Sequence, residues 1–314
     1  MNDMMKTEQM SLQELFERFL RLSVADGRAS PRTIASYRDG LALYFSWLKD
    51  RDMDPLTTTY DEVQIYRSWL IAKYKPGTVR IRLTAVRVLY RALQRWGRRP
   101  DDPAAGIKGP KERSSPVDKL MQRGLSPDEA KLLLVGIGQY DGAAAARDRA
   151  IIELLLFQGL RADELAGARL EDLDMLGLSA IKIMGKGSKE RTIMLSERCR
   201  ISLKRWLELR GTLPGALFHR LEGEAVRLSV RTIERIVDKG LKRAGLKRPG
   251  RSAHALRHTY AVLSVLGGAQ RERLGDSLGH ASLSTTDVYI RAAGRYQENP
   301  AEAVQVALER TVTP

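Results

Sequence analysis

The chain has 314 residues, enough for two domains that each bury a core. Its 53 lysines and arginines outnumber its 38 aspartates and glutamates, which gives a formal net charge of +15 and an isoelectric point near 10.0. This surplus favours a polyanionic partner, because each neutralised phosphate releases condensed counterions. One cysteine, Cys199, excludes an intramolecular disulfide and a cysteine-based zinc site.

The N-terminal residues do not resemble a secretory signal. MNDMMKTEQMSLQELF lacks a basic start followed by an apolar stretch. No apolar run approaches the roughly 20 residues that are needed to cross a bilayer. We therefore expect a cytoplasmic protein that does not associate with membranes.

Apolar residues at helical spacing predict four helices in the first hundred residues: 11–22, 30–48, 60–74 and 76–97. No comparable alternation with a period of two occurs there. The fourth helix has one apolar face, predicted to be buried, formed by Val79, Leu83, Val86, Tyr90 and Leu93.

The same helix has a separate stripe of arginines. At 100° per residue, one narrow arc contains Arg80, Arg87, Arg91, Arg95 and Arg98. A solvated helix usually mixes charges of both signs, and no acidic residue lies between Val63 and Pro100. We therefore interpret the stripe as a surface that faces phosphates, although an ordinary exposed face is the simpler alternative.

Residues 100–126 are rich in proline, glycine, serine and charge and show no periodicity. We place the domains at 1–112 and 123–314, with a linker at 113–122. Both halves have more basic than acidic residues. This balance favours two parts that both contact the polyanion, as a clamp would.

The second half has mixed character. Ser126, Pro127 and Glu129 form a capping-box pattern at the start of a helix. Two β-prone runs within 179–195 flank a basic GKGSK tip and predict a hairpin. Further helices are predicted at 146–159, 196–210, 229–244, 253–267, 270–278, 282–290 and 299–311. The fold class is therefore mainly α with a small β-sheet, the second domain being α+β.

Three of the four histidines fall between residues 254 and 280, close to an arginine and a tyrosine. Transfer of a phosphodiester to a side chain needs a nucleophile, cationic donors for the phosphate oxygens, a proton acceptor and a proton donor. The candidate groups for this chemistry are Arg161, Lys186, His254, Arg257, His280 and Tyr289. No metal or other cofactor is required.

The order and spacing of these groups resemble a known family. GLRADEL (159–165), GKGSKER (185–191), HALRH (254–258) and LGHASLSTTDVY (278–289) are similar to the motifs of tyrosine recombinases of the phage integrase and Xer type. The resemblance covers nearly the whole chain. It implies a helical, SAM-like core-binding domain followed by a catalytic domain.

The resemblance also implies a role for each group. Arg161 and Arg257 would hold the scissile phosphate, with His254 and His280 completing its hydrogen-bond shell. Lys186 would protonate the leaving 5′ oxygen, although Lys189 competes for that role. Tyr289 would attack phosphorus and form a 3′-phosphotyrosyl bond, with His254 accepting its proton.

Two residues near these motifs receive no catalytic role from the resemblance. Glu164 is expected to support Arg161 or the hairpin. His258 stays outside the catalytic set. The segment GAQRERLGDSLGH (268–280) departs from the family because several usually apolar positions are charged or glycine.

A second basic run, KGLKRAGLKRPGR (239–251), precedes His254. We predict DNA-backbone contacts there, with a solvated loop as the alternative; the residues concerned are Lys242, Arg243, Lys247, Arg248 and Arg251.

The resemblance implies partners as well. The protein would bind a specific double-stranded DNA site and form a homotetramer on it, joined through the tail helix 299–311. Assembly with a different recombinase as partner is the alternative. The first core helix begins by about residue 11, which favours Xer-like dimer resolution or a compact mobile-element integrase over larger phage integrases.

Three other activities compete with recombination through a Holliday junction. A strand-passing or hairpin-forming relative would share the tyrosine chemistry. A DNA-binding protein of the same fold that has lost catalysis would lack one of the key groups, whereas each is present here. A metal-dependent nuclease would need clustered carboxylates, and this set of groups is cationic.

Overall fold

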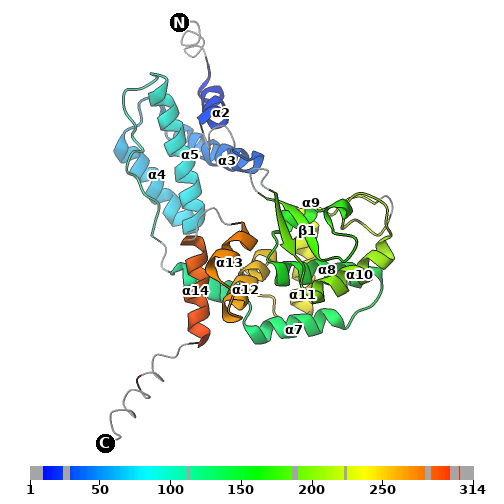
Figure 1. The fold of residues 1–314 in the computed structure, drawn as a ribbon. Helices are drawn as coiled ribbons and strands as arrows, with labels where there is room; N and C mark the ends of the chain where they lie inside the picture. The colour runs from blue at the N-terminus through cyan, green and yellow to red at the C-terminus, as the bar shows by residue number, and fades with distance from the viewer. Residues whose placement is uncertain are drawn as a thin grey trace, which may run out of the picture. The chain divides into compact units, whose positions relative to one another are not determined.

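The computed structural model describes residues 10–23, 29–111, 114–185, 190–222, 225–279, 284–297 and 304. By their internal contacts the residues divide into two units, Met1–Arg113 and Ser114–Pro314. Each unit is helical apart from a two-stranded sheet in the second (Figure 1). Within the described residues, no helix is long and apolar enough to cross a membrane.

The first unit contains the four predicted helices: α2 (Leu12–Ser23), α3 (Pro31–Lys49), α4 (Tyr60–Lys73) and α5 (Pro76–Arg95). Helix α5 is central, because α2, α3 and α4 all pack against it. The predicted apolar face of α5 is confirmed, since each of its five members is at most 1% exposed. Inside the unit, the hydroxyls of Tyr44 and Tyr90 are hydrogen-bonded at 2.7 Å.

The segment predicted as a linker contains helix α6 (Pro116–Arg123), so that part of the prediction is wrong. Ser115 caps this helix, and its hydroxyl accepts a hydrogen bond from the Asp118 amide at 3.0 Å. Val117 and Leu120 are buried in a cluster of the second unit. Ser115, Pro116 and Asp118 repeat the start signal that identifies the next helix at Ser126.

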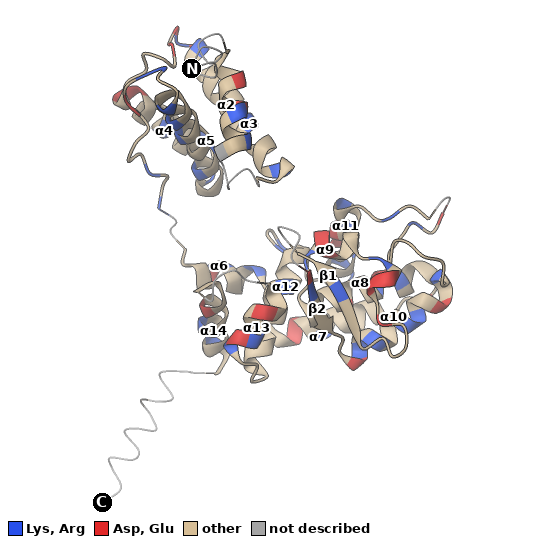
Figure 2. Cartoon of the chain, turned by 45° about the horizontal axis from the view of Figure 1, so that its top comes forward, with Lys and Arg blue, Asp and Glu red and all other residues tan. Residues whose placement is uncertain are grey.

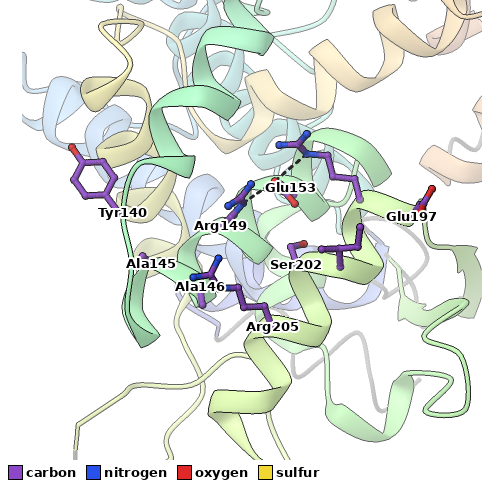
Figure 3. Close-up of a pocket in the computed structure, with 10 residues that line it drawn as sticks. Tyr140, Ala145, Ala146, Arg149, Glu153, Glu197, Ser202 and Arg205 are labelled. Carbon is purple, nitrogen blue, oxygen red and sulfur yellow. Dashed lines mark hydrogen bonds and ion pairs between the residues drawn. The ribbon is translucent and has the colours of Figure 1, made fainter.

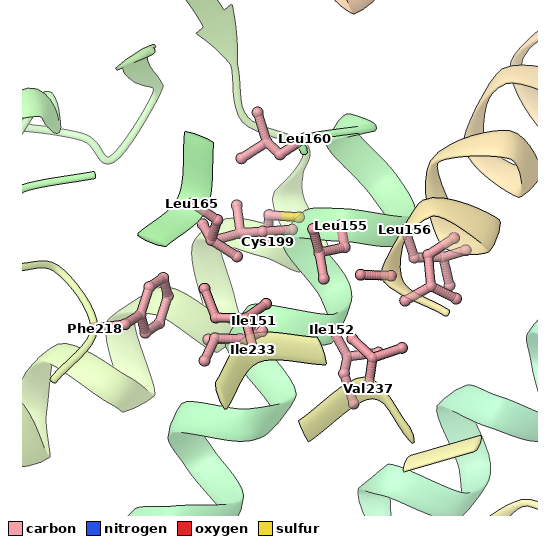
Figure 4. Packing of buried hydrophobic residues seen from close by; sticks show 14 of the residues in the cluster. Ile151, Ile152, Leu155, Leu156, Leu160, Leu165, Cys199, Phe218, Ile233 and Val237 are labelled. Atoms are coloured by element: carbon pink, nitrogen blue, oxygen red, sulfur yellow. The ribbon is translucent and has the colours of Figure 1, made fainter. Parts of the chain in front are cut away.

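The second unit is built around α8 (Ala143–Gln158), which packs against α7 (Pro127–Gly138), α10 (Glu197–Arg210), α11 (Val230–Arg243) and α12 (Ala253–Leu266). The cluster between them is drawn in Figure 4, where Ile151 of α8 lies close to Ile233 of α11 and Ile152 of α8 lies close to Val237 of α11. Cys199 is buried in the same cluster.

The predicted hairpin is confirmed as an antiparallel pair, β1 (Ala180–Met184) and β2 (Glu190–Met194). Met184 pairs with Glu190, so the connecting segment is 185–189. A short helix, α9 (Ala162–Gly167), and a 3₁₀ turn, η2 (Leu170–Asp172), precede the hairpin and contact β1.

The last described helices are α13 (Arg271–Leu278) and α14 (Ser284–Gln297), which is longer than the predicted 282–290. A separate apolar cluster joins α6, α12, α13 and α14. The unusual charges of α13 are partly explained, because Arg271 forms a 2.7 Å ion pair with Asp287 of α14. Apart from Val304, the predicted tail helix 299–311 lies outside the described residues.

Candidate active site

The chain turns sharply at Gly159 before Arg161. Gly159 has a φ of +60°, a left-handed conformation that favours glycine. A Cβ atom there would lie 2.2 Å from the Tyr260 ring, so the close packing also requires glycine. The turn places Arg161 at the N-cap of α9.

Glu164 anchors Arg161 at this turn. Its carboxylate accepts hydrogen bonds from the Arg161 backbone amide at 2.8 Å and from Nη1 at 2.9 Å. The carboxylate is buried, whereas 32% of the Arg161 side chain remains exposed. Arg161 is therefore oriented by a buried group and still accessible to a ligand. The predicted supporting role of Glu164 agrees with these contacts.

Arg257 of α12 is 1% exposed and connects two distant segments. Its Nη1 donates to the Gly159 carbonyl oxygen at 2.6 Å, and its Nη2 donates to the carbonyl of Leu278 at the end of α13. Desolvation, together with the charge of nearby Arg161, lowers the pKa of Arg257 to about 10. The guanidinium therefore stays protonated at neutral pH, with Arg161 close by.

Arg191 of β2 is a site residue that was not predicted from the sequence. Its Nη1 and Nη2 donate to the two carboxylate oxygens of Glu164 at 2.8 and 3.0 Å, and its Nε donates to the Ser277 carbonyl oxygen at 3.1 Å. Arg191 therefore ties the hairpin to α9 and to the end of α13. The signal available was its place in GKGSKER, five residues after Lys186.

Burial alone would raise the pKa of Glu164, but hydrogen bonds from Arg191 and from the Arg161 amide outweigh it. The pKa of this carboxyl is therefore held below its usual value of 4.5. Arg257 Nη1 lies 4.0 Å from the same carboxylate. One buried anion thus balances part of the charge of three arginines.

Tyr289 of α14 is 4% exposed and lies beside α12. Its hydroxyl is hydrogen-bonded to Nδ1 of His258 at 3.0 Å. Burial raises the pKa of Tyr289, although the positive charges of Arg257 and Arg161 oppose the shift. Tyr289 is therefore neutral at physiological pH, within the electrostatic influence of both predicted phosphate-binding arginines.

His254 and His258 lie one helical turn apart on α12. Their ring centroids are 4.4 Å apart, and the rings meet edge to face at 74°. Partial desolvation and the charges of Arg257, Arg161 and Arg123 lower the pKa of His254. The Tyr289 hydroxyl is thus hydrogen-bonded to His258, which was predicted to lie outside the catalytic set, and His254 is the neighbour of His258.

Lys186 and His280 lie outside the described residues, as does Lys189. The elements next to them are described. Glu190 and Arg191 follow the hairpin connection, and Gly279, with a φ of +62°, precedes His280. A Cβ atom at Gly279 would lie 3.4 Å from Nη1 of Arg191. The residue before His280 is therefore adjacent to the arginine that holds Glu164.

The predicted DNA-contact residues of α5 differ in exposure. Arg80, Arg91 and Arg95 are exposed, whereas Arg87 and Arg98 are partly buried. Arg87 donates to the Thr84 hydroxyl at 3.0 Å. Figure 2 shows basic positions in blue along α4 and α5. The arginine stripe thus stays a prediction.

In the second basic run, the prediction for Arg251 is corrected. Its side chain is 4% exposed, and its guanidinium donates to Glu129 Oε2 at 2.7 Å and to the Leu246 carbonyl oxygen at 3.0 Å. Arg251 therefore joins the run to α7 from inside the unit. A DNA contact would require this buried ion pair to break.

The other members of this run lie nearer the surface. Lys242 and Arg248 are exposed. The guanidinium of Arg243 lies 3.6 Å from the ring centroid of Tyr140, and Lys247 Nζ lies 2.5 Å from Asp238 Oδ1. These four residues stay predicted DNA contacts.

A pocket of about 380 Å³ lies apart from these groups, between α8 and α10 (Figure 3). The buried carboxylate of Glu153 forms ion pairs there with Arg149 at 3.2 Å and with Arg198 at 3.1 Å. Tyr140 and Arg205 also line it. The pocket contains none of the predicted site residues, so it is separate from the candidate active site.

The sequence matches two family descriptions. Residues 123–295 match the model of the phage integrase family, and residues 16–97 match "Phage integrase, N-terminal SAM-like domain". The chain belongs to the phage integrase family.

The chain is 32% identical over 291 residues to a tyrosine recombinase XerC of Myxococcus xanthus, covering 90% of this chain and 94% of the relative. It is 30% identical over 281 residues to a tyrosine recombinase XerC of Corynebacterium glutamicum, covering 87% and 85%. These relatives confirm the predicted enzyme class, a tyrosine-type site-specific DNA recombinase.

Solved structures share the fold at lower identity. A XerH recombinase in a post-cleavage complex with palindromic difH substrate has a TM-score of 0.73 and 22% identity, covering 95% of this chain and 86% of that one. A lambda integrase tetramer bound to a Holliday junction has a TM-score of 0.72 and 17% identity, covering 91% and 78%. The predicted fold class is therefore confirmed.

Proposed function

We propose that this recombinase cleaves and rejoins DNA through a covalent bond between Tyr289 and a 3′ phosphate. The observation that carries the proposal is that the Tyr289 hydroxyl lies beside α12, the helix that carries Arg257. Arg257 binds the Gly159 turn, and Glu164 holds Arg161 at the same turn. Such an arrangement supplies a nucleophile and two cationic donors to one phosphate.

Arg161 and Arg257 bind the non-bridging oxygens and stabilise the additional negative charge of the transition state. Both guanidiniums are oriented before DNA arrives, Arg161 by Glu164 and Arg257 by backbone carbonyls. This preorganisation avoids reorientation during the reaction. His254 and His280 add hydrogen bonds to the same phosphate.

The Tyr289 oxygen forms a bond to phosphorus while the bond from phosphorus to the 5′ oxygen breaks. Lys186, on the connection between β1 and β2, supplies the proton to the leaving oxygen. The products are a 3′-phosphotyrosyl linkage and a free 5′-hydroxyl. Because the new ester replaces the old one, a second DNA end reverses the step without ATP, and no metal takes part.

Two such exchanges on paired duplexes pass through a Holliday junction, with a tetramer of the chain holding both DNA sites. Support comes from the similarity to XerC recombinases over 90% of the chain and from the fold shared with a lambda integrase tetramer on a Holliday junction. The exposed arginines of α5 bind the DNA backbone from the first unit. Dimer resolution and mobile-element integration both suit this activity, and the C-terminal segment 299–311 joins the protomers.

A suicide substrate tests this proposal. It carries a nick near the cleavage position, so that the short 5′-hydroxyl strand is lost and the covalent adduct accumulates. We expect wild type to form the adduct in the presence of EDTA and Tyr289→Phe to form none. An adduct that persists in Tyr289→Phe would contradict the assignment of the nucleophile. DNA binding without any adduct would favour a catalytically silent DNA-binding protein.

A further inference from the structure

The phenol of Tyr289 is a poor nucleophile in the form that the structure describes. Burial raises its pKa, so the hydroxyl keeps its proton at neutral pH. A tyrosine that attacks phosphorus has to lose this proton as the new bond forms. The group that receives the proton must lie within hydrogen-bond distance of the hydroxyl, which makes its position the first criterion.

His258 meets this criterion. Its Nδ1 lies 3.0 Å from the Tyr289 hydroxyl, and the two rings have centroids 5.8 Å apart. His258 is partly buried on α12, one residue after Arg257. When Nε2 carries the ring proton, Nδ1 accepts the hydrogen bond from the Tyr289 hydroxyl. The distance falls in the range that direct proton transfer requires.

His254 is less suited to the same task. It is an exposed residue one turn earlier on α12. Its ring packs edge to face against the ring of His258, and the hydrogen bond to the Tyr289 hydroxyl is made by His258. The positive charges of Arg257, Arg161 and Arg123 disfavour a further positive charge on His254. A neutral His254 can still donate a hydrogen bond to a phosphate oxygen.

We propose that His258 accepts the proton of the Tyr289 hydroxyl during attack and returns it when the DNA is rejoined. This inference rests on the function proposed above. In the forward step the tyrosine oxygen bonds to phosphorus, its proton moves to Nδ1 of His258, and the 5′ oxygen leaves with a proton from Lys186. In the reverse step a 5′-hydroxyl attacks phosphorus and gives its proton back to Lys186, while the His258 imidazolium protonates the departing tyrosine oxygen, so protons and charge balance over the cycle.

The charged groups that act on His254, whose ring packs against His258, are Arg257 on the same helix, Arg161 at the start of α9 and Arg123 at the end of α6. A bound phosphate offsets part of this positive charge. Proton transfer to His258 is therefore easier with DNA in place than without it, which couples activation of the tyrosine to substrate binding.

A matched pair of substitutions separates proton transfer from positioning. In His258→Asn, the side-chain amide lies where Nδ1 lies in histidine and accepts a hydrogen bond without being basic. In His258→Gln, the amide reaches the position of Nε2. We expect both to lower the rate of adduct formation about 10²-fold or more, with DNA affinity within twofold of wild type. Since either variant suffices, a folding defect in one leaves the test intact.

The pH dependence of cleavage provides a readout that a structural role would not change. Wild type should lose activity with a slope of one as pH falls and the accepting histidine becomes protonated. His258→Asn should not show this loss of activity at low pH. The matched control His254→Asn should cleave more slowly than wild type and still show it. The proposal would be overturned if His258→Asn still lost activity as pH falls and His254→Asn did not.

A second substrate distinguishes the two ends of the reaction. With sulfur in place of the leaving 5′ oxygen, the thiolate departs without a proton, so variants of Lys186 should recover. Variants of His258 should not recover, because their defect is at the nucleophile. Recovery of His258→Asn on the sulfur-containing substrate would overturn the proposal. Cleavage of the ordinary substrate by His258→Asn at a rate within threefold of wild type, or faster than wild type, would also overturn it.

Failure of this inference is distinguishable from failure of the proposed function. If wild type forms no adduct with any DNA site, the proposed function itself fails. If wild type forms an adduct that depends on Tyr289 and His258→Asn forms it as fast, only the role of His258 fails.

Discussion

Glu164 and Arg191 are joined by a two-point ion pair that connects α9 to β2. The distances from Nη1 and Nη2 of Arg191 to the two carboxylate oxygens are 2.8 and 3.0 Å. The same carboxylate binds Arg161, and Arg191 also binds the end of α13. The pair therefore links three of the segments that carry predicted catalytic groups: the α9 turn, the hairpin and the segment before His280.

We predict that Glu164→Gln lowers both stability and cleavage. The neutral amide leaves Arg191 and Arg161 without a buried counter-charge, and breaking such a pair typically costs about 3–5 kcal/mol. Urea unfolding at pH 7 measures the loss, and the suicide-substrate assay measures cleavage. A midpoint equal to that of wild type would contradict the central role of this carboxylate.

The same carboxylate predicts a dependence of stability on pH. The pKa of Glu164 is lower in the folded state than its usual 4.5, so its contribution is fully present above that value and is lost as pH falls through the folded pKa. Wild type should therefore lose more stability than Glu164→Gln on acidification from pH 7 to below 4.5. Urea midpoints over this range measure the difference, and equal losses in the two proteins would contradict it.

Arg191→Lys should reduce cleavage although the charge is kept. A lysine cannot make two parallel hydrogen bonds to Glu164 and a third to the Ser277 carbonyl, because it lacks the guanidinium fork. We expect a loss of about 10²-fold in the rate of adduct formation, as is typical of a misplaced reacting group.

The matched control for Arg191 is Lys182→Ala on the same hairpin. Lys182 forms a 3.7 Å ion pair with Glu190 in which both side chains are more than half exposed. Exposed pairs of this kind are worth little, so this substitution should leave stability and cleavage nearly unchanged. Equal losses in Lys182→Ala and Arg191→Lys would attribute the effect to hairpin charge in general and contradict the positioning role.

Gly159→Ala should be strongly destabilising. The added methyl would lie 2.2 Å from the Tyr260 ring, so the turn that places Arg161 and binds Arg257 would have to move. Gly245→Ala is the matched control, because its φ of +69° is similar and no atom lies within 4 Å of the added methyl. We expect about 1–2 kcal/mol for the control, from backbone conformation alone, and clearly more for Gly159→Ala. Thermal unfolding measures both.

The exposed arginines of α5 predict the salt dependence of DNA binding. Replacing Arg91 by glutamine should weaken binding to different DNA sequences about equally and reduce the slope of log affinity against log salt by about one, as expected for one lost phosphate contact. Lys49→Gln, at the exposed end of α3, is the control. An unchanged slope in Arg91→Gln would remove this residue from the DNA-binding surface.

The helices of the first unit could be predicted from sequence because their periodicity is strong and local. Helix α6 was missed, although Ser115, Pro116 and Asp118 give the start signal that was recognised at Ser126. The helix is only eight residues long, too short for a periodic pattern, and its two buried side chains pack against distant segments. Composition alone therefore predicted a linker.

Residues of the candidate site could be predicted only where they occupy a position in a recognisable motif. Motifs predict Arg161, Arg257 and Tyr289 as site residues, but the role of Arg191 depends on contacts with α9 and α13 that no local pattern reveals. The same holds for Arg251, whose basic surroundings suggested DNA although its partner is Glu129 of α7. The hydrogen bond between His258 and Tyr289 joins residues 31 positions apart and requires the packed α12 and α14.

Mass spectrometry of the adduct trapped on a suicide substrate tests the central claim most directly. After digestion with protease and nuclease, we predict a single peptide, containing Tyr289, that carries a nucleotide on its phenolic oxygen through a 3′ phosphate, with a 5′-hydroxyl on the released strand. A nucleotide attached to another residue, for example to Tyr260 of α12 or Tyr296 of α14, or a 5′-phosphate linkage, would contradict the account.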